Sequence, residues 1–286
     1  MKSSNMESAS PPSLSSRVLQ GDIPHILEEI FLYLDYESLK TCFEVCNDWR
    51  KILKSESFRR KANNVFAAEI TTDQKELVIA CGEGDIEMIK RLLSTDMLNV
   101  NREVEHPDET DYTYHATPLS QAVERGETNA VKLLLERGAD PNNLIVPNED
   151  GYTALHLAAQ EGYKEVAQLL LDGGANPNLA DMIYQNTALH FVALEGHNNV
   201  LHVLLSRGGD PNITNEDGNT PLHHAAQYGH KDAMQVLLGK GADPNVKDGN
   251  GDTPLSLVLI DSQIDDSNER RTVAQILLDA GANLIV

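Results

Sequence analysis

Cysteine, histidine and clustered aspartate are the residue types here that could ligate a metal or carry out catalysis. The three cysteines, Cys42, Cys46 and Cys81, occupy apolar helical positions, and Cys42 and Cys46 lie four residues apart without a neighbouring histidine. Zinc sites group several Cys and His ligands at characteristic spacings. We therefore predict buried thiols rather than a metal site, in a reducing intracellular compartment, the cytoplasm, the nucleus or both.

Three histidines, His156, His190 and His223, recur in one slot of successive similar segments. Hydrogen bonding within and between these segments is expected there, in place of catalysis or metal binding. The run 248–252 resembles the start of a calcium-binding loop, but the glycine needed at its sixth position and the glutamate at its twelfth are absent. Nucleophile elbows, zinc-protease helices and dinucleotide-binding motifs are also missing. The sequence predicts a non-enzymatic protein without a cofactor.

The segments that carry these histidines belong to an internal repeat. From Asp217 the chain reads DGNTPLHHAAQYGHKDAMQVLLGKGADPN, and equivalent leucines recur at intervals of 36, 34, 33 and 33 residues at Leu119, Leu155, Leu189, Leu222 and Leu255. This period and the T-P-L-H-x-A signature resemble the ankyrin-repeat family. A degenerate copy near Leu77 comes before these five, and the last of the five, which begins at Thr253, is also degenerate, so the expected number of repeats is six.

The ankyrin resemblance implies two helices and a finger-like hairpin in each repeat. Thr220 is expected to cap the helix that Pro221 begins. Ala225 and Ala226 keep that helix thin, so that the second helix packs closely, and Gly229 supplies the left-handed turn between the two. One repeat buries too little surface to be stable alone, so neighbouring repeats must stack into a continuous core.

A different pattern precedes the array. Residues 22–54 read DIPHILEEIFLYLDYESLKTCFEVCNDWRKILK, with apolar residues in three groups at helical spacing and a break at Asp35. Three short helices form too small a unit to bury all these side chains against one another. An apolar face is therefore left for a partner.

The order of residues in this segment resembles the F-box family. The matching positions are Ile23-Pro24, Ile30 to Asp35, Ser38-Leu39 and Val45 to Arg50, with Ile23 and Ile26 as departures from the usual Leu and acidic residue. The resemblance implies docking onto the Skp adaptor of SCF (cullin-RING) ubiquitin ligases. A helical cap on the array is the alternative, and it would need no such fixed order. The adaptor-binding residues implied are Ile23, Pro24, Leu27, Ile30, Phe31, Leu34, Leu39, Val45, Cys46 and Trp49.

Negative charge is concentrated in the repeats. Residues 1–70 carry 9 Lys+Arg and 10 Asp+Glu, a net of −1, which leaves −20 of the formal −21 for residues 71–286. Such a surface repels nucleic acid and anionic membranes and favours a basic protein partner, although acidity can also serve solubility alone. No apolar run approaches the length of a membrane-spanning helix, and no secretory signal begins the chain.

The ankyrin resemblance places partner binding on the concave side, at hairpin tips and exposed positions of each first helix. Tyrosines there are candidate hot spots, or else ordinary half-exposed side chains. Tyr163 takes a His slot of the repeat and is expected to pack internally. The partner-binding residues implied are Tyr114, Glu149, Asp150, Tyr152, Glu161, Tyr184, Asn186, Glu195, Glu216, Asp217, Asn219 and Tyr228.

Two insertions interrupt the period. Leu77 and Leu119 lie 42 residues apart, with the excess near REVEHPDETDYTYH, and IDSQIDDSNERR lengthens the last repeat. Insertions in loops can add binding specificity or can simply be tolerated.

The expected architecture is all-α, a short three-helix F-box-like module followed by an ankyrin solenoid of about six helix-turn-helix repeats with hairpin fingers. Residues 1–20 form a disordered Ser/Pro-rich tail, 21–62 the module, 63–73 a linker and 74–286 the array. The function predicted is substrate recognition for an SCF-type ubiquitin ligase, with the Skp adaptor and the cullin-RING core as partners and an unidentified, basic protein as substrate. A scaffold that binds a partner without ubiquitin transfer is the alternative.

Overall fold

The computed structural model describes residues 73–94, 98–107, 113–144, 151–260, 263–264 and 266–283. Backbone contacts divide the chain into two units, residues 1–71 with 95–97, and residues 72–94 with 98–286. All described residues belong to the second unit. The helices predicted within residues 22–54 lie outside the described residues.

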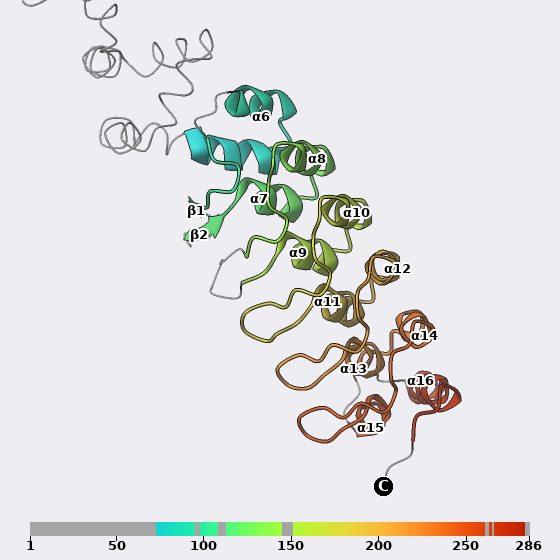
Figure 1. The fold of residues 1–286 in the computed structure, drawn as a ribbon. Coiled ribbons are helices and arrows are strands. Elements are labelled where there is room, and N and C mark those ends of the chain that lie inside the picture. The colour runs from blue at the N-terminus through green and yellow to red at the C-terminus, as the bar shows by residue number, and fades with distance from the viewer. Residues whose placement is uncertain are drawn as a thin grey trace, which may run out of the picture. The chain divides into compact units, whose positions relative to one another are not determined.

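Within the described residues, twelve helices form six successive pairs (Figure 1). The first helices of the pairs are residues 73–83, α7 (Pro118–Glu124), α9 (Ala154–Gln160), α11 (Ala188–Glu195), α13 (Pro221–Gln227) and α15 (Pro254–Ile260). The second helices are α6 (Ile86–Leu93), α8 (Thr128–Glu136), α10 (Lys164–Asp172), α12 (Asn198–Ser206), α14 (Lys231–Gly239) and α16 (Ser267–Asp279). From α7 onward, each first helix packs on the next first helix, and from α6 onward each second helix packs on the next second helix. The predicted helical solenoid is confirmed.

The first helices α7, α9, α11 and α13 begin after a threonine whose backbone is extended rather than helical. Thr220 has φ −90° and ψ 165°, and Pro221 follows it as the first helical residue. Its backbone N–H donates to Nδ1 of His223 across 3.0 Å. In α7, Ser120 replaces the histidine, and its hydroxyl oxygen accepts from the Thr117 N–H at 2.9 Å. A local side-chain acceptor thus satisfies a backbone donor that the helix leaves unpaired.

The core runs continuously through the stack. Leu155, Leu189 and Leu222 are at most 2% exposed, and Ala225 and Ala226 are fully buried. Methyl side chains at these positions let the paired helices approach closely, as the sequence predicted, and each leucine fills the space between neighbouring repeats.

Bidentate asparagines join each repeat to the next. Asn178 accepts from the Asp210 N–H at 2.8 Å through Oδ1, and its Nδ2 donates to the Gly208 carbonyl at 3.0 Å. The same two bonds recur at Asn101, Asn142, Asn212 and Asn245. Because the oxygen and the nitrogen of the side-chain amide are both bonded, each such asparagine, which we call a rung, fixes the spacing of two adjacent loops.

The turn glycines between paired helices also contact the following repeat. Gly196 has φ +76°, and an added Cβ would lie 2.7 Å from Nδ1 of His230. The equivalent contact at Gly126 is made by the ring of Tyr163, which is half-buried and packs against the core. The predicted internal packing of Tyr163 is confirmed.

The finger loops project beyond the row of first helices, on the side away from the second helices (Figure 1). The insertion between α6 and α7 forms an antiparallel pair, β1 (Val104–Pro107) and β2 (Thr113–Ala116), with Val104 opposite Ala116. In the last-repeat insertion, Ile264 is 4% exposed and lies against Gly229 of the preceding repeat. This insertion is therefore partly built into the stack.

Candidate functional site

Several predicted site residues cannot be placed. The ten adaptor-binding residues of the F-box-like segment lie outside the described residues, as do Glu149 and Asp150. Tyr114 lies in β2, paired with His106 of β1. The remaining nine predicted partner-binding residues lie between 152 and 228, on or beside the fingers and first helices.

One row of site residues follows the ends of the first helices. Glu161 is the C-cap of α9, Glu195 is the last residue of α11, and Tyr228 is the C-cap of α13. All three are exposed. Tyr228 is 44% exposed, and its ring stacks on His230 with centroids 6.4 Å apart and 9° between planes. The stacking fixes the orientation of a tyrosine that solvent can still reach.

Hydrogen bonds join neighbouring fingers into one surface. We define the fourth, fifth and sixth fingers as residues 179–187, 213–220 and 246–253. The Glu216 N–H donates to the Tyr184 carbonyl at 2.8 Å, and Nδ2 of Asn215 donates to Oδ1 of Asn186 at 3.0 Å. The Gly249 N–H donates to the Asp217 carbonyl at 2.7 Å. These three bonds place residues from separate repeats beside one another.

The repeated histidines bind each finger to the helix behind it. Nε2 of His156 contacts the Leu179 carbonyl at 2.9 Å, and Nε2 of His190 contacts the Asn219 carbonyl at 3.0 Å. Nδ1 of each ring accepts from the backbone N–H of its threonine, so Nε2 must carry the proton and donate. The predicted hydrogen bonding of these histidines within and between repeats is confirmed.

Burial keeps these rings neutral. Loss of solvent lowers the pKa of His156 to about 4 and that of His190 to about 3, and the neighbouring His224 also lowers the His190 pKa. Burial lowers the pKa of His224 to about 4 as well. A general base works best with a pKa near the operating pH and with access to substrate. Rings that are buried and committed to two hydrogen bonds act here as supports of the fingers.

Two further observations bear on chemistry. Cys81 is fully buried, as predicted for this cysteine. Desolvation raises its pKa to about 12, so the thiol stays protonated and unreactive. Across the described part of the chain, no three His, Cys, Asp or Glu side chains gather as a metal ion would require. In the same residues, no helix is both long and apolar enough to span a bilayer.

Tyr152 is less available than its position in the sequence indicated. It is half-buried, and its ring meets Phe191 edge-on at 5.5 Å and His156 at 6.2 Å. Part of its surface therefore packs between the third and fourth repeats rather than facing a partner.

An exposed apolar tip was only partly predicted from the sequence. Met182, Ile183 and Tyr184 are 57%, 37% and 53% exposed at the end of the fourth finger, and Met182 was not among the residues predicted to face a partner. A comparison of the finger sequences could have revealed this tip. The fourth finger has Met-Ile-Tyr where the fifth has Glu-Asp and the sixth has Gly-Asn, so it is one residue longer and apolar.

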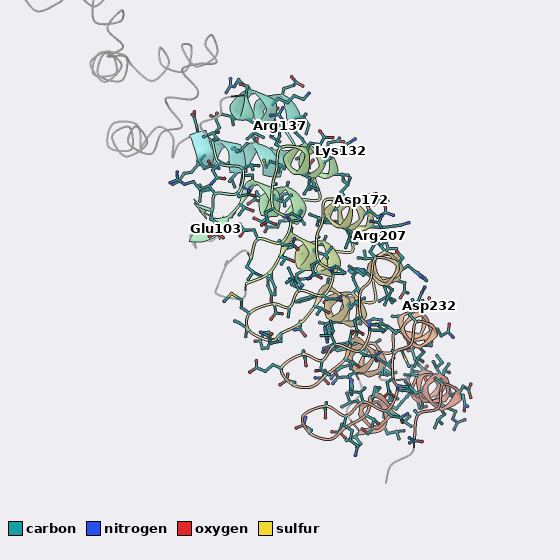
Figure 2. All side chains as sticks on the ribbon, viewed as in Figure 1. Glu103, Lys132, Arg137, Asp172, Arg207 and Asp232 are labelled. Atoms are coloured by element: carbon teal, nitrogen blue, oxygen red, sulfur yellow. The ribbon has the colours of Figure 1, made fainter. Side chains whose placement is uncertain are left out.

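Charge differs between the two rows of helices. In residues 163–172, 197–207, 230–240 and 266–279, the second helices and their ends carry Lys164, Arg207, Lys231, Lys240, Arg270 and Arg271 among their acids. Figure 2 shows both signs along this row, where Arg207 pairs with Asp172 at 2.6 Å. By contrast, residues 151–161, 179–195, 213–228 and 246–260, on the finger side, contain one Lys or Arg, Lys247. Their acids are Glu161, Asp181, Glu195, Glu216, Asp217, Asp248 and Asp252.

Comparison with known proteins covers both parts of the chain. A family model for ankyrin repeats (3 copies) matches residues 77–181 and 189–286, and a model for the F-box domain matches residues 22–61. The human transient receptor potential cation channel subfamily A member 1 is 36% identical over 81 residues, which is 28% of this chain and 6% of the channel. The chain therefore resembles only a small part of that protein.

Proposed function

Because this chain belongs to the ankyrin-repeat family and carries an F-box domain at residues 22–61, we propose that it is a substrate-recognition adaptor of an SCF-type ubiquitin ligase. The presence of both modules in one chain carries this proposal. The module at residues 21–62 docks onto the Skp adaptor, and the repeats at 74–286 hold the protein to be modified. The cullin-RING core then lies on the same assembly as the substrate.

The chain contributes binding rather than covalent chemistry in this proposal. Two binding modules on one chain raise the effective concentration of a bound substrate beside a ubiquitin-conjugating enzyme. Transfer to a substrate lysine then resembles an intramolecular reaction, for which positioning supplies much of the rate. The acidic finger side and its hydrogen-bonded fingers support a protein, and a basic one, as the substrate.

Replacing Ile30 and Leu34 by Asp tests the adaptor role. Charges on the apolar face predicted for the first helix of the F-box segment should weaken Skp binding by at least about 2 kcal/mol, the loss typical of a hot spot. The measurement is the dissociation constant between the purified full chain and the Skp adaptor. Glu29→Ala with Asp48→Ala, at polar positions of the same segment, is the matched control and should bind normally.

Two results would count against this function. Unchanged Skp binding by the Ile30→Asp/Leu34→Asp variant overturns the F-box role. Loss of the repeats' thermal transition in the same variant supports the cap alternative instead, because a cap stabilises the array that it covers. A complex that binds a partner but never transfers ubiquitin to it in a reconstituted reaction supports the scaffold alternative.

A further inference from the structure

We infer that the fourth finger is the anchor by which the array holds its partner, and that the partner presents a short apolar segment flanked by Lys or Arg. The inference rests on the proposed function only in taking that partner as the protein to be modified. Four features of residues 181–186 and their neighbours carry it: exposed apolar area, a fixed loop, support from both adjacent fingers and an acidic surround.

The longest run of consecutive exposed apolar side chains in the described residues lies at this tip. Seven large apolar side chains are exposed in the described residues, and three of them, Met182, Ile183 and Tyr184, are consecutive. Isolated exposed apolar residues are ordinary, but a contiguous group at a projecting tip keeps a hydrophobic surface in water. Met and Tyr are also enriched in the cores of protein interfaces.

The loop that presents this tip is held by its own hydrogen bonds. Oδ1 of Asp181 accepts from the Tyr184 N–H at 2.7 Å, and the Asp181 carbonyl accepts from Nε2 of Gln185 at 3.1 Å. The Asp181 N–H donates to the Asn186 carbonyl at 2.8 Å. Asp181 itself is 1% exposed. A tip fixed before binding loses little conformational freedom when the partner arrives.

Gln185 adopts a backbone conformation that its side chain disfavours. It has φ +56° and is the one non-glycine residue with positive φ among those described, whereas the equivalent positions of the neighbouring fingers are Gly151, Gly218 and Gly251. A strained residue persists where the surroundings fix it, and such residues concentrate at functional sites. Here the hydrogen bonds of Asp181 to Tyr184 and Gln185 hold the strained turn, at whose end the three apolar side chains are exposed.

Neighbouring fingers brace the tip on both sides. The Tyr184 carbonyl accepts from the Glu216 N–H of the fifth finger at 2.8 Å. On the other side, Met182 lies against Gly151 of the third finger, so close that an added Cβ would be 2.2 Å from its Cγ. The apolar tip is therefore a fixed part of a surface built by three repeats rather than an isolated loop.

Charge around the tip selects the chemistry of the partner. The finger-side segments 151–161, 179–195 and 213–228 contain no Lys or Arg. Glu216 and Asp217 are exposed in the fifth finger, which is hydrogen-bonded to the tip, and Glu161 and Glu195 are exposed at the ends of α9 and α11. Three consecutive residues span only about 10 Å, so the apolar contact is short. A segment with one or two large apolar residues and Lys or Arg on both sides matches both features, because its apolar part covers the tip and its cations face the acids of the fifth finger and of the first-helix ends.

Random peptides displayed on phage are the probe. The full chain is immobilised, and enriched peptides are sequenced and synthesised for binding measurements. We expect enrichment of large apolar residues next to Lys or Arg relative to the input library. Replacing Met182 and Tyr184 by Ser should weaken the best peptide by at least about tenfold, a loss typical of hot-spot removal.

The matched control removes equally exposed apolar side chains elsewhere. Ile79→Ser with Leu259→Ser changes residues that are 44% and 54% exposed in the first and last repeats, and peptide binding should stay unchanged. Asp181→Ala, which removes the bond to Tyr184, should weaken binding, whereas Asp181→Asn, which keeps an acceptor oxygen, should weaken it less. Thermal transitions confirm that each variant folds.

Three outcomes overturn the inference. These are the absence of any enriched peptide, enrichment without an excess of Lys or Arg, and equal peptide binding by the wild-type chain and the Met182→Ser/Tyr184→Ser variant. Skp binding, measured on the same variants, separates this test from the ligase role. If peptides bind through the fourth finger but the chain does not bind Skp, the ligase role is excluded and the inference about the finger stands. If the chain binds Skp but its peptides bind independently of the finger, the ligase role stands and the inference is excluded.

Discussion

Buried histidines of the Thr-x-x-His units couple protonation to the attachment of the fingers. His156 and His190 donate through Nε2 to carbonyls of the following finger, and both are at most 2% exposed. Protonation would place a charge where the ring is desolvated and would convert Nδ1 from an acceptor into a donor facing the threonine N–H. Burial therefore lowers the pKa of each ring, and the folded array excludes the extra proton.

The free energy of unfolding should consequently fall as the pH drops below 6.5. Burial depresses the folded pKa of His156, His190 and His224 to about 4, 3 and 4, so the unfolded chain takes up the protons first. The contribution of these neutral rings to the free energy of unfolding is fully present above the unfolded pKa of about 6.5 and is lost as the pH falls from 6.5 to about 4. At pH 5.5 the proton that each ring takes up on unfolding should lower the free energy of unfolding by about 1.4 kcal/mol relative to neutral pH.

Urea unfolding between pH 7.5 and about 5.5 checks this dependence, in a range where most unfolded carboxylates remain ionised. His190→Gln should be less stable at pH 7 but should lose less stability on acidification than the wild-type chain. His202→Gln, at an exposed position of α12, is the matched control. Parallel pH curves for His190→Gln and wild type would contradict the linkage.

Asparagine rungs act at the scale of the element, because each one joins two neighbouring loops. Removing the Asn178 side chain takes away one donor and one acceptor bond at 3.0 and 2.8 Å. We expect Asn178→Ala to cost about 1–2 kcal/mol, since two partly exposed hydrogen bonds are lost. Asn178→Asp keeps the acceptor and should cost less. Asn250→Ala, at an exposed finger tip, is the control, and equal unfolding midpoints for the two alanine variants would exclude the rung's contribution.

Substitutions at two turn glycines can distinguish the cost of backbone strain from the cost of steric contact between neighbouring fingers. Gly151 has φ +64° and lies under Met182, whereas Gly174 has φ +94° and no atom within 4 Å of an added Cβ. Gly174→Ala should cost roughly 1–2 kcal/mol for the left-handed conformation alone. Gly151→Ala should cost more, because Met182 must also move. Thermal or urea unfolding measures both, and equal losses would mean that Met182 adapts freely.

The charge distribution belongs to the scale of the whole array. The finger-side segments 151–161, 179–195, 213–228 and 246–260 hold seven acids and one cation, Lys247, while the second helices carry both signs. Neutralising Glu161, Glu195 and Glu216 as Gln should lower the association rate of a selected basic peptide several-fold at low salt, with a smaller effect when salt shortens the Debye length to about 8 Å. These side chains are exposed, so little change in melting temperature is expected.

Three exposed acids on the second helices provide the matched control. Glu136→Gln, Glu165→Gln and Asp232→Asn remove the same formal charge from the other row of helices. If the finger side steers the partner, this triple variant should change the association rate less than the finger-side one across a salt series. Equal effects would mean that net charge alone acts, and a rate indifferent to salt would remove the inference of a basic partner.

The sequence by itself determined the repeat architecture. Period and local chemistry suffice there, because Thr220, Pro221 and Gly229 set a helix start and a turn whatever the neighbouring repeat contains. The slot shared by His156, His190 and His223 likewise predicted hydrogen bonding between repeats, and the place of Tyr163 in the pattern predicted its packing. Each of these features depends on a position within one repeat.

The tertiary structure decided which residues face solvent together. Tyr152 and Tyr184 look alike in the sequence, yet Tyr152 packs against Phe191 of the next repeat and Tyr184 stays 53% exposed. The β1–β2 pair and the separation of charge between helix rows likewise arise from how repeats lie beside one another. These features depend on residues that vary from one repeat to the next and lie about 33 positions apart, whereas the repeat pattern fixes only the positions that all repeats share.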